Sequence, residues 1–329
     1  MINMIKKIRI NLSVENLKAV SQLIRLPNIL IIILTQVLLR YCILAPLIYS
    51  RNQGTGTSLA DFIALVAATV LIAVGGYVIN DYFDVKIDSV NRPDKLLVNR
   101  LISARGAIKL HILLNVLAMF IGFYLSWRVK AVSFGLIFPF LSGVLWIYSA
   151  KYKRVFFWGN FLVAALSSFV ILIVWLFEFF WLRIHALSFG DALPYIRSIN
   201  SVFLGYAIFA FLVSMIREIV KDMEDTEGDT LFGCRTLPVV AGMQYTRYLV
   251  AAIILMTILL LAYAQFILYR LGMMMVFWYF LVTVQAGAFY LLLSLFRARE
   301  KQDYHFLSNL CKLIMVAGIM SIEIIYISV

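Results

Sequence analysis

Three aspartates stand close together in the segment NDYFDVKIDSV, directly after an apolar run of the chain. Asp81, Asp84 and Asp88 are spaced three and then four residues apart, so they share one face if the segment is helical. Like charges at this range repel each other, and the apolar run before them is long enough to cross a membrane. Nearby positive charge is therefore needed to offset the repulsion among these three carboxylates.

A second group repeats the same spacing later in the chain. Asp222, Asp225 and Asp229, in the segment KDMEDTEGD, are again three and then four residues apart. Two facing groups of carboxylates at a membrane surface carry a large repulsive and desolvation cost unless cations lie between them. Mg²⁺ prefers carboxylate oxygens, keeps part of its water and shares its other positions with phosphate oxygens. The repeat therefore predicts a Mg²⁺ site for a diphosphate, with all six aspartates as metal ligands.

Other sites that use acidic loops or cysteines fit these residues less well. An EF-hand needs oxygens at alternate positions around a central glycine, an arrangement that neither segment has. A phosphatidyltransferase of the CDP-alcohol type needs the pattern D-G-x-x-A-R, which neither segment contains. Cys42, Cys234 and Cys311 lie far apart in the sequence, so neither a disulfide framework nor a zinc site is predicted.

The composition predicts a membrane protein around these aspartates. The chain of 329 residues is 63% hydrophobic and 14% charged, with a mean hydropathy of +0.94, which is more apolar than a soluble domain of this length. About nine apolar stretches are long enough to cross a bilayer as helices, so we predict an all-α membrane protein. The predicted spans lie near 28–48, 59–79, 107–126, 131–150, 158–180, 201–219, 248–269, 273–296 and 308–327.

The net charge of +12 reflects the orientation of the spans rather than binding to nucleic acid. Most of the 29 Lys and Arg residues fall in the N-terminal segment and in every second loop. The exceptions are Arg40, Arg51, Arg128, Lys130, Arg183, Arg197 and Arg270. The positive-inside rule therefore puts the N-terminus and both aspartate segments in the cytoplasm and the C-terminus on the opposite face, in the cytoplasmic membrane. Attraction to anionic membrane lipids reinforces this orientation.

The sequence predicts that the chain consists of a short N-terminal segment and one membrane domain. Residues 1–26 mix basic residues with scattered apolar ones and have no continuous apolar core, so they do not look like a cleaved signal peptide. We expect them to form a cytoplasmic segment that lies in the membrane interface. Residues 27–329 then form one membrane domain of nine helices, with long polar loops only near 80–106, 183–200 and 220–246.

These motifs resemble those of the UbiA superfamily of intramembrane prenyltransferases. The pattern N-D-x-x-D-x-x-x-D, which begins at Asn80, is similar to the first aspartate signature of that superfamily, and the second aspartate group is similar to its second signature. Further matches are RLPN with Arg25 and Asn28, NRPDK with Arg92, YSAKYKR from Tyr148 to Arg154, GN with Asn160, and RTLP from Arg235. The resemblance runs along nearly the whole chain, and its fuller patterns are most similar to the digeranylgeranylglyceryl phosphate synthase branch.

The resemblance implies nine helices around a central cavity, Mg²⁺ as cofactor, a polyprenyl diphosphate donor and a lipophilic acceptor. In the branch named above, the reaction is geranylgeranyl transfer to geranylgeranylglyceryl phosphate in ether-lipid synthesis. The candidate catalytic residues are Asp84, Asp225, Lys153 and Arg154. The candidate substrate-binding residues are Arg25, Asn28, Asn80, Arg92, Tyr148, Lys151, Asn160, Lys221 and Arg235.

The chemistry of an allylic diphosphate agrees with these residue types. Such a donor ionises to a delocalised carbocation when its leaving group is stabilised, and Mg²⁺ held by aspartates neutralises that group as its charge develops. Four cations on the same predicted side of the membrane can also contact phosphate oxygens directly. They are Lys151, Lys153, Arg154 and Arg235.

The sequence leaves the acceptor open. An aromatic acceptor, as in quinone or chlorophyll-type biosynthesis, attacks through a ring carbon, whereas a glyceryl phosphate attacks through a hydroxyl oxygen. No lone general base in the sequence decides between them. A membrane transporter is the third alternative, but transporters place ionisable groups near the bilayer midplane, whereas Glu178 and Glu323 lie toward the ends of their predicted spans.

Overall fold

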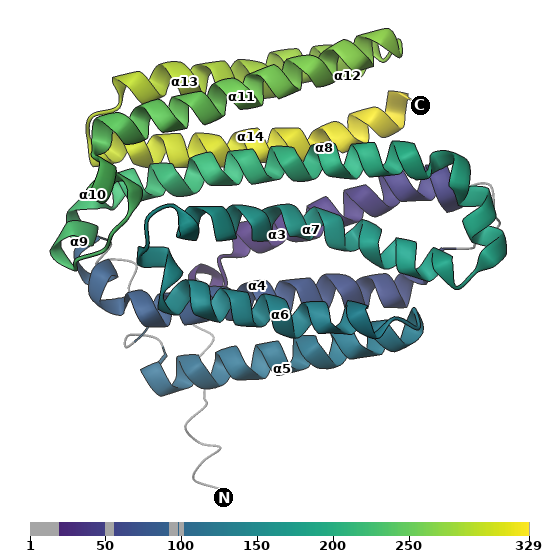
Figure 1. Cartoon of the computed structure of the whole chain (residues 1–329), viewed down its shortest axis with the longest axis horizontal. Coiled ribbons are helices and arrows are strands. Elements are labelled where there is room, and N and C mark those ends of the chain that lie inside the picture. Colours follow the sequence, from purple (N-terminus) through teal and green to yellow (C-terminus); the bar gives the residue numbers. More distant parts are fainter. Residues whose placement is uncertain (1–19, 50–55, 92–97, 99–101, 329) are drawn as a thin grey trace, which may run out of the picture.

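The computed structural model describes residues 20–49, 56–91, 98 and 102–328, and these form a bundle of long helices (Figure 1). The segment predicted at 1–26 therefore lies mostly outside the described residues. The helices in chain order are α3 (Leu26–Leu38), η1 (Leu39–Tyr49), α4 (Leu59–Asn91), α5 (Ala104–Arg128), α6 (Val132–Ala150), η3 (Tyr152–Arg154), α7 (Trp158–Arg183), α8 (Ala186–Glu224), α9 (Thr226–Leu231), α10 (Leu237–Ala241), α11 (Met243–Arg270), α12 (Met274–Tyr279), η4 (Phe280–Gln285), α13 (Ala286–Arg297) and α14 (Lys301–Ser328).

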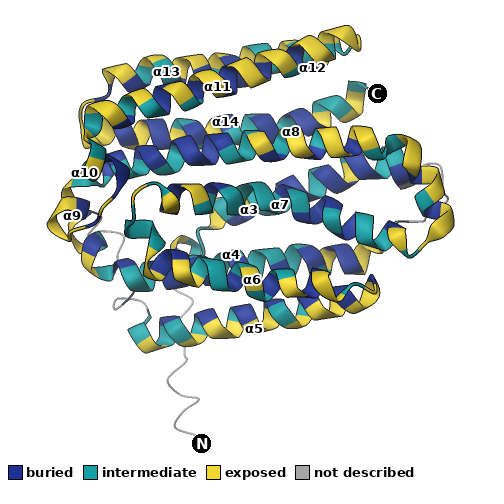
Figure 2. Cartoon of the chain, viewed as in Figure 1, coloured by how far each residue is buried: buried dark blue, intermediate teal, exposed yellow. Residues whose placement is uncertain are grey.

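The predicted fold class is confirmed. In the described part of the chain, nine helical segments are long and apolar enough to cross a bilayer. Much of their outer surface is apolar and exposed, as the yellow positions on α5, α11 and α13 illustrate (Figure 2). A surface of this kind is stable against lipid, because a helix satisfies its own backbone hydrogen bonds without water. The protein is therefore an integral membrane protein.

Two helices extend well beyond the spans predicted from hydropathy. The helix α4 continues past its apolar run to Asn91, and α8 begins at Ala186, inside the expected loop at 183–200. The hydropathy signal stops where the side chains become polar, but a helix hydrogen-bonds its backbone internally and can continue through polar sequence. The extension of α4 matters most, because it puts the first aspartate group on a rigid helix rather than in a loop.

Two hydrophobic clusters hold the bundle together, and α8 belongs to both. Phe203 of α8 packs in the first cluster with residues of α3, α4, α6 and α7. Ile216, further along α8, packs in the second cluster with residues of α11, α13 and α14. Figure 1 shows α11, α12 and α13 as an outer layer beyond α14 and α8. The helix α8 therefore fixes this outer layer relative to the rest of the bundle.

A buried polar network closes the end of the bundle opposite the aspartates. Arg40 of η1 donates through Nη1 to Thr57 Oγ1 at 2.6 Å, and Thr57 Oγ1 donates to Glu178 Oε2 of α7 at 2.8 Å. The side chains of all three residues are buried. Buried polar groups need such partners to offset their loss of hydration. The network therefore connects η1, the start of α4 and α7.

The contact between α5 and α6 depends on a glycine. A Cβ added to Gly122 of α5 would lie 2.3 Å from Cδ2 of the buried Phe138 on α6. We expect Gly122→Ala to lower the free energy of unfolding by about 1–3 kcal/mol, because the Phe138 ring cannot move without displacing its neighbours. Unfolding in mixed detergent micelles measures this.

Gly143→Ala on α6 is the matched control, since a Cβ there would meet nothing within 4 Å. We expect this control to leave the stability unchanged or to raise it by up to about 1 kcal/mol, the difference in helix propensity. Equal destabilisation by both substitutions would contradict this account of the α5–α6 contact.

Candidate active site

A cavity of about 320 Å³ lies among α3, α4, α6, α7, α8 and α14. Its inner part is lined by apolar side chains such as Phe138, Ile171 and Ile319, and its mouth is lined by charged ones. A smaller pocket adjoins the mouth and shares four aspartates with the cavity, two from each group. They are Asp84, Asp88, Asp222 and Asp225. The two aspartate groups therefore face one space, as their shared spacing predicted.

Asp84 is the most buried member of the first group. It accepts a hydrogen bond from Asn80 Nδ2 at 2.9 Å and forms an ion pair with Lys153 of η3. Burial alone would lower the pKa of Lys153, but the charge of Asp84 raises it above its ordinary value. Asp84 Oδ1 and Asn80 Oδ1 are buried and have no hydrogen-bond partner among the described residues. Two acceptor oxygens at the mouth thus remain to be satisfied.

Asp81 differs from the other five aspartates, because it lines neither the cavity nor the small pocket. It pairs instead with Arg25, whose Nη2 lies 2.8 Å from Asp81 Oδ1. Arg25 precedes α3 in a left-handed backbone conformation with φ of 52°, and its guanidinium lies 4.7 Å from the centre of the Tyr77 ring. Burial would lower the pKa of Arg25, but Asp81 together with Tyr77 and Glu218 raises it. Asp81 therefore orients Arg25, which does line the cavity.

The second aspartate group is divided by a break between two helices. Asp222 lies in the last turn of α8 and accepts a hydrogen bond from Asn160 Nδ2 of α7 at 2.8 Å. Asp225 lies between α8 and α9, and Asp229 lies on α9 and accepts from Thr236 Oγ1 at 3.0 Å. Burial, together with the charge of Asp225, raises the pKa of Asp229 to about 6, against the effect of the Thr236 hydrogen bond. A cation bound beside Asp229 would favour its charged form and so oppose the effect of burial.

The mouth fits Mg²⁺ only when a phosphate completes the coordination. Nowhere in the described residues do three acidic, histidine or cysteine side chains come close enough to form a metal site by themselves. Mg²⁺ is commonly held by one or two carboxylates, with phosphate and water in its other positions. The unsatisfied oxygens of Asp84 and Asn80, with Asp88, Asp222 and Asp225 facing the same pocket, match that requirement. This donor set suits a hard cation bound together with a diphosphate.

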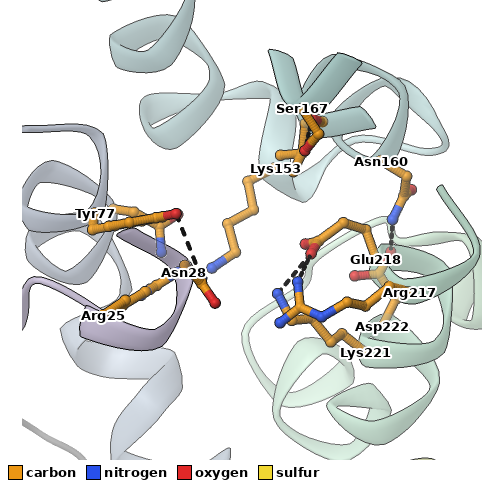
Figure 3. Close-up of polar contacts among 12 residues, drawn as sticks. Arg25, Asn28, Tyr77, Lys153, Asn160, Ser167, Arg217, Glu218, Lys221 and Asp222 are labelled. Atoms are coloured by element: carbon orange, nitrogen blue, oxygen red, sulfur yellow. Dashed lines mark hydrogen bonds and ion pairs between the residues drawn. The ribbon is translucent and has the colours of Figure 1, made fainter. Parts of the chain in front are cut away.

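The structure brings most of the remaining predicted residues to the cavity. Its lining includes Arg25, Asn28, Asn80, Tyr148, Lys153, Asn160 and Lys221. Figure 3 shows Lys153 between the residues of α3 and α4 and those of α8. Asn28 Nδ2 donates to the Tyr77 hydroxyl at 3.4 Å.

Three of the predicted residues occupy other positions. Arg154 lines only the small pocket and donates through Nη2 to Phe83 O at 2.8 Å. Lys151 is exposed and lines neither space, and Arg235 is also exposed while its backbone N donates to Arg154 O at 2.9 Å. Arg92 lies outside the described residues.

The sequence did not single out several charged residues of the cavity. Arg217 and Glu218 of α8 and Lys312 of α14 line it beside Lys221. Their signal is visible in the printed sequence, since ionisable side chains inside an apolar helix are costly and mark functional positions. The sequence argument assigned these cations to the orientation of the spans, so their place in the cavity was missed.

Asn91 connects the two aspartate segments. Its Oδ1 accepts from Gly228 N at 3.0 Å, and its Nδ2 donates to Asp225 O at 3.2 Å. Lys301 Nζ, at the start of α14, donates to Asn91 O at 2.8 Å. Position 228 needs glycine, because a Cβ there would lie 2.3 Å from Asn91 Oδ1. The end of α4 and α9 are thereby held at a fixed separation across the mouth.

Comparison with known proteins identifies the family. The model of the UbiA prenyltransferase family matches residues 41–310, and the chain belongs to this family. A digeranylgeranylglyceryl phosphate synthase of Methanothermobacter thermautotrophicus is 36% identical over 200 residues, which cover 59% of this chain and 62% of that protein. One of Thermococcus gammatolerans is 30% identical over 231 residues, which cover 70% of this chain and 73% of that protein. The first alignment thus spans less than two thirds of the relative's length.

Solved structures agree with the fold. One is a structure described as giving insights into digeranylgeranylglyceryl phosphate synthase in membranes, with a TM-score of 0.61 at 22% identity. The match covers 96% of this chain and 100% of that one. A UbiA homologue from Archaeoglobus fulgidus bound to GPP and Mg²⁺ has a TM-score of 0.56 at 16% identity, covering 93% of this chain and 99% of that one. At these identities the likeness concerns the fold alone.

We expect Asn91→Ala to reduce both stability and activity. The substitution leaves the buried Gly228 N–H without its partner and frees α9 from α4, which costs about 1–3 kcal/mol for an unsatisfied buried donor. Detergent-micelle unfolding and a prenyl-transfer assay measure the two effects. Ser89→Ala is the control, because Ser89 is exposed and its hydroxyl donates to Lys86 O within its own helix. Wild-type stability and turnover in Asn91→Ala would show that the connection is dispensable.

Proposed function

We propose that this protein is a Mg²⁺-dependent prenyltransferase that transfers a geranylgeranyl group from its diphosphate to geranylgeranylglyceryl phosphate within the membrane. The observation that carries the proposal is the shared space: two aspartate groups from distant parts of the chain line one pocket at the mouth of an apolar cavity. The printed names of the relatives support this donor and acceptor, and the homologue bound to GPP and Mg²⁺ supports the cofactor. Family membership supports the reaction class.

Each end of the cavity suits one end of the donor. Asp84, Asp88, Asp222, Asp225 and Asp229 would hold Mg²⁺, which supplies positive charge to the diphosphate. Lys153 and Arg154 lie at the same place and donate hydrogen bonds to phosphate oxygens. Asn160 keeps Asp222 in position through its 2.8 Å hydrogen bond. The apolar inner cavity takes the isoprenoid chain and excludes water from it.

The transfer breaks one bond and forms another. The bond between the first carbon of the donor and its diphosphate oxygen breaks with both electrons leaving on the diphosphate, and the carbon becomes an allylic cation. The acceptor hydroxyl oxygen then bonds to that carbon, and its proton is released to the departing diphosphate or to water. Tyr77 and Tyr148 line the cavity and supply aromatic rings that stabilise a cation.

The orientation in the membrane is part of the proposal. The basic residues are concentrated on the side of the aspartate groups, which supports a cytoplasmic mouth, a cytoplasmic N-terminus and a C-terminus on the opposite face of the cytoplasmic membrane. Prenyl diphosphates are water-soluble at their head and would enter from that side. The polar network of Arg40, Thr57 and Glu178 closes the opposite end of the bundle.

Removal of Mg²⁺ should abolish prenyl transfer, and added Mg²⁺ should restore it.

Asp84→Ala and Asp225→Ala should each lower turnover at least ~10²-fold, comparable to the loss of one strong transition-state contact. Product formation at saturating donor, as a function of free Mg²⁺, measures both effects. Activity that persists in excess chelator, or a variant with wild-type turnover, would overturn the metal site or exclude that carboxylate from it.

The acceptor is tested by comparing two chemical classes of acceptor in separate reactions. Purified protein receives geranylgeranyl diphosphate with either geranylgeranylglyceryl phosphate or a panel of hydroxylated aromatic acids, and mass spectrometry resolves the products. We expect an ether on the glyceryl phosphate, because its hydroxyl is a competent oxygen nucleophile and its apolar chain fits the lining of the cavity. Transfer to an aromatic ring with none to the glyceryl phosphate would reject this acceptor and leave the fold unaffected.

A further inference from the structure

A second group of charged residues lines the same cavity as the aspartates. Arg217 and Glu218 are neighbours on α8, Lys221 lies one turn after Glu218, and all three line the cavity (Figure 3). Lys312 of α14 lines the same cavity. The proposed mechanism assigns no ligand to Arg217, Glu218 or Lys312.

Glu218 holds the two cations of α8 in place. Arg217 Nη1 lies 2.8 Å from Glu218 Oε1, and Lys221 Nζ lies 2.7 Å from the same oxygen. The side chains of Arg217, Glu218 and Lys221 are 15%, 12% and 21% exposed, so the group is largely withdrawn from solvent. Arranged in this way, one carboxylate fixes the direction of both cations without cancelling their combined charge.

Arg217 retains hydrogen-bonding capacity that the protein does not use. Its guanidinium has several N–H donors, of which Nη1 donates to Glu218. Its Nε is buried and has no acceptor within the part of the chain that the structure describes. A buried donor without an acceptor costs free energy, and an anion bound in the cavity would supply the acceptor.

Arg217 is set back along α8 from the aspartates at the mouth, whereas Lys221 directly precedes Asp222. Arg217 precedes Asp222 by five residues, which at the helical rise corresponds to about 7.5 Å along α8. The cavity therefore offers a place for a second anion, with Lys221 nearest to the first.

We infer that Arg217, Lys221 and Lys312 form the subsite that binds the phosphate of the acceptor, with Glu218 as a positioning residue. This inference rests on the proposed function, since it concerns the acceptor of that reaction. In a glyceryl phosphate the free hydroxyl is only a few bonds from the phosphorus atom. A phosphate held beside Arg217 therefore places this hydroxyl between the two anions, next to the carbon that loses its diphosphate.

The chemistry of the group favours a phosphate over a carboxylate. A phosphate monoester carries a charge of about −1.5 to −2 and offers three acceptor oxygens. The planar guanidinium of Arg217 matches that geometry, and the two lysines of the same cavity add compact positive charges.

The subsite is tested by varying donor and acceptor separately. Full-length protein with Mg²⁺ receives geranylgeranyl diphosphate and either geranylgeranylglyceryl phosphate or the same glyceryl ether without its phosphate. For Arg217→Gln we expect the KM of the phosphorylated acceptor to rise at least ~10-fold, the effect of losing a charge-assisted hydrogen bond, with the donor KM unchanged. The preference for the phosphorylated over the unphosphorylated acceptor should fall by the same factor.

Three further variants keep the result interpretable. Arg297→Gln removes an exposed arginine of α13 that does not line the cavity, and it should behave as wild type. Arg217→Lys should recover part of the acceptor preference because it keeps the charge. Lys221→Gln should reproduce the acceptor effect if Arg217→Gln fails to fold, as judged by its thermal unfolding.

The outcomes separate the subsite from the function. If wild type forms no ether product, the proposed function and this inference both fail. If wild type forms the ether but both glutamine variants keep the acceptor KM and the phosphate preference, only the subsite fails. A rise in the donor KM equal to that of the acceptor would assign these cations to the donor diphosphate and would also reject the subsite.

Discussion

The structure depends on the cost of placing carboxylates at the edge of an apolar bundle. Negative charges in a medium of low dielectric repel strongly and lose their hydration, so each must find a positive or hydrogen-bonding partner. The partners come from different parts of the chain: Lys153 from η3, Arg25 from the start of α3 and Asn160 from α7. Compensation of charge thus brings together elements that are distant in sequence, and it does so on the rim of the cavity.

The bilayer imposes the complementary constraint on the rest of the molecule. Because lipid competes well for apolar side chains, the helices are not held together by apolar burial as strongly as in water. Close contacts at small residues such as Gly122 and buried polar contacts such as Arg40 with Thr57 therefore contribute to their association. The long helix α8, shared by both hydrophobic clusters, carries the rigidity from the core to Asp222.

The sequence predicted the parts of this structure that depend on local pattern. The spans follow from apolar length, and the convergence of the aspartates follows from their repeated spacing, because both signals are written within short segments. Contacts between distant segments were not predictable in the same way. The pairing of Asp81 with Arg25, which takes this carboxylate away from the cavity, depends on how the start of α3 packs on α4. The place of Arg217 in the cavity depends on the direction in which α8 faces, and the extension of α4 to Asn91 has no hydropathy signal.

The hydrogen bond from Lys301 to Asn91 has a consequence for biogenesis. Lys301 begins α14, the last helix that the structure describes, and Asn91 ends α4, the second of the apolar segments found in the described residues, so this contact joins an early and a late part of the chain. During synthesis the early segments enter the membrane well before α14 leaves the ribosome, because chains are made from the N-terminus at a limited rate. The rim around α4 and α9 therefore reaches its final arrangement only when the last helix inserts. Until then the nascent chain can occupy the membrane without a finished site.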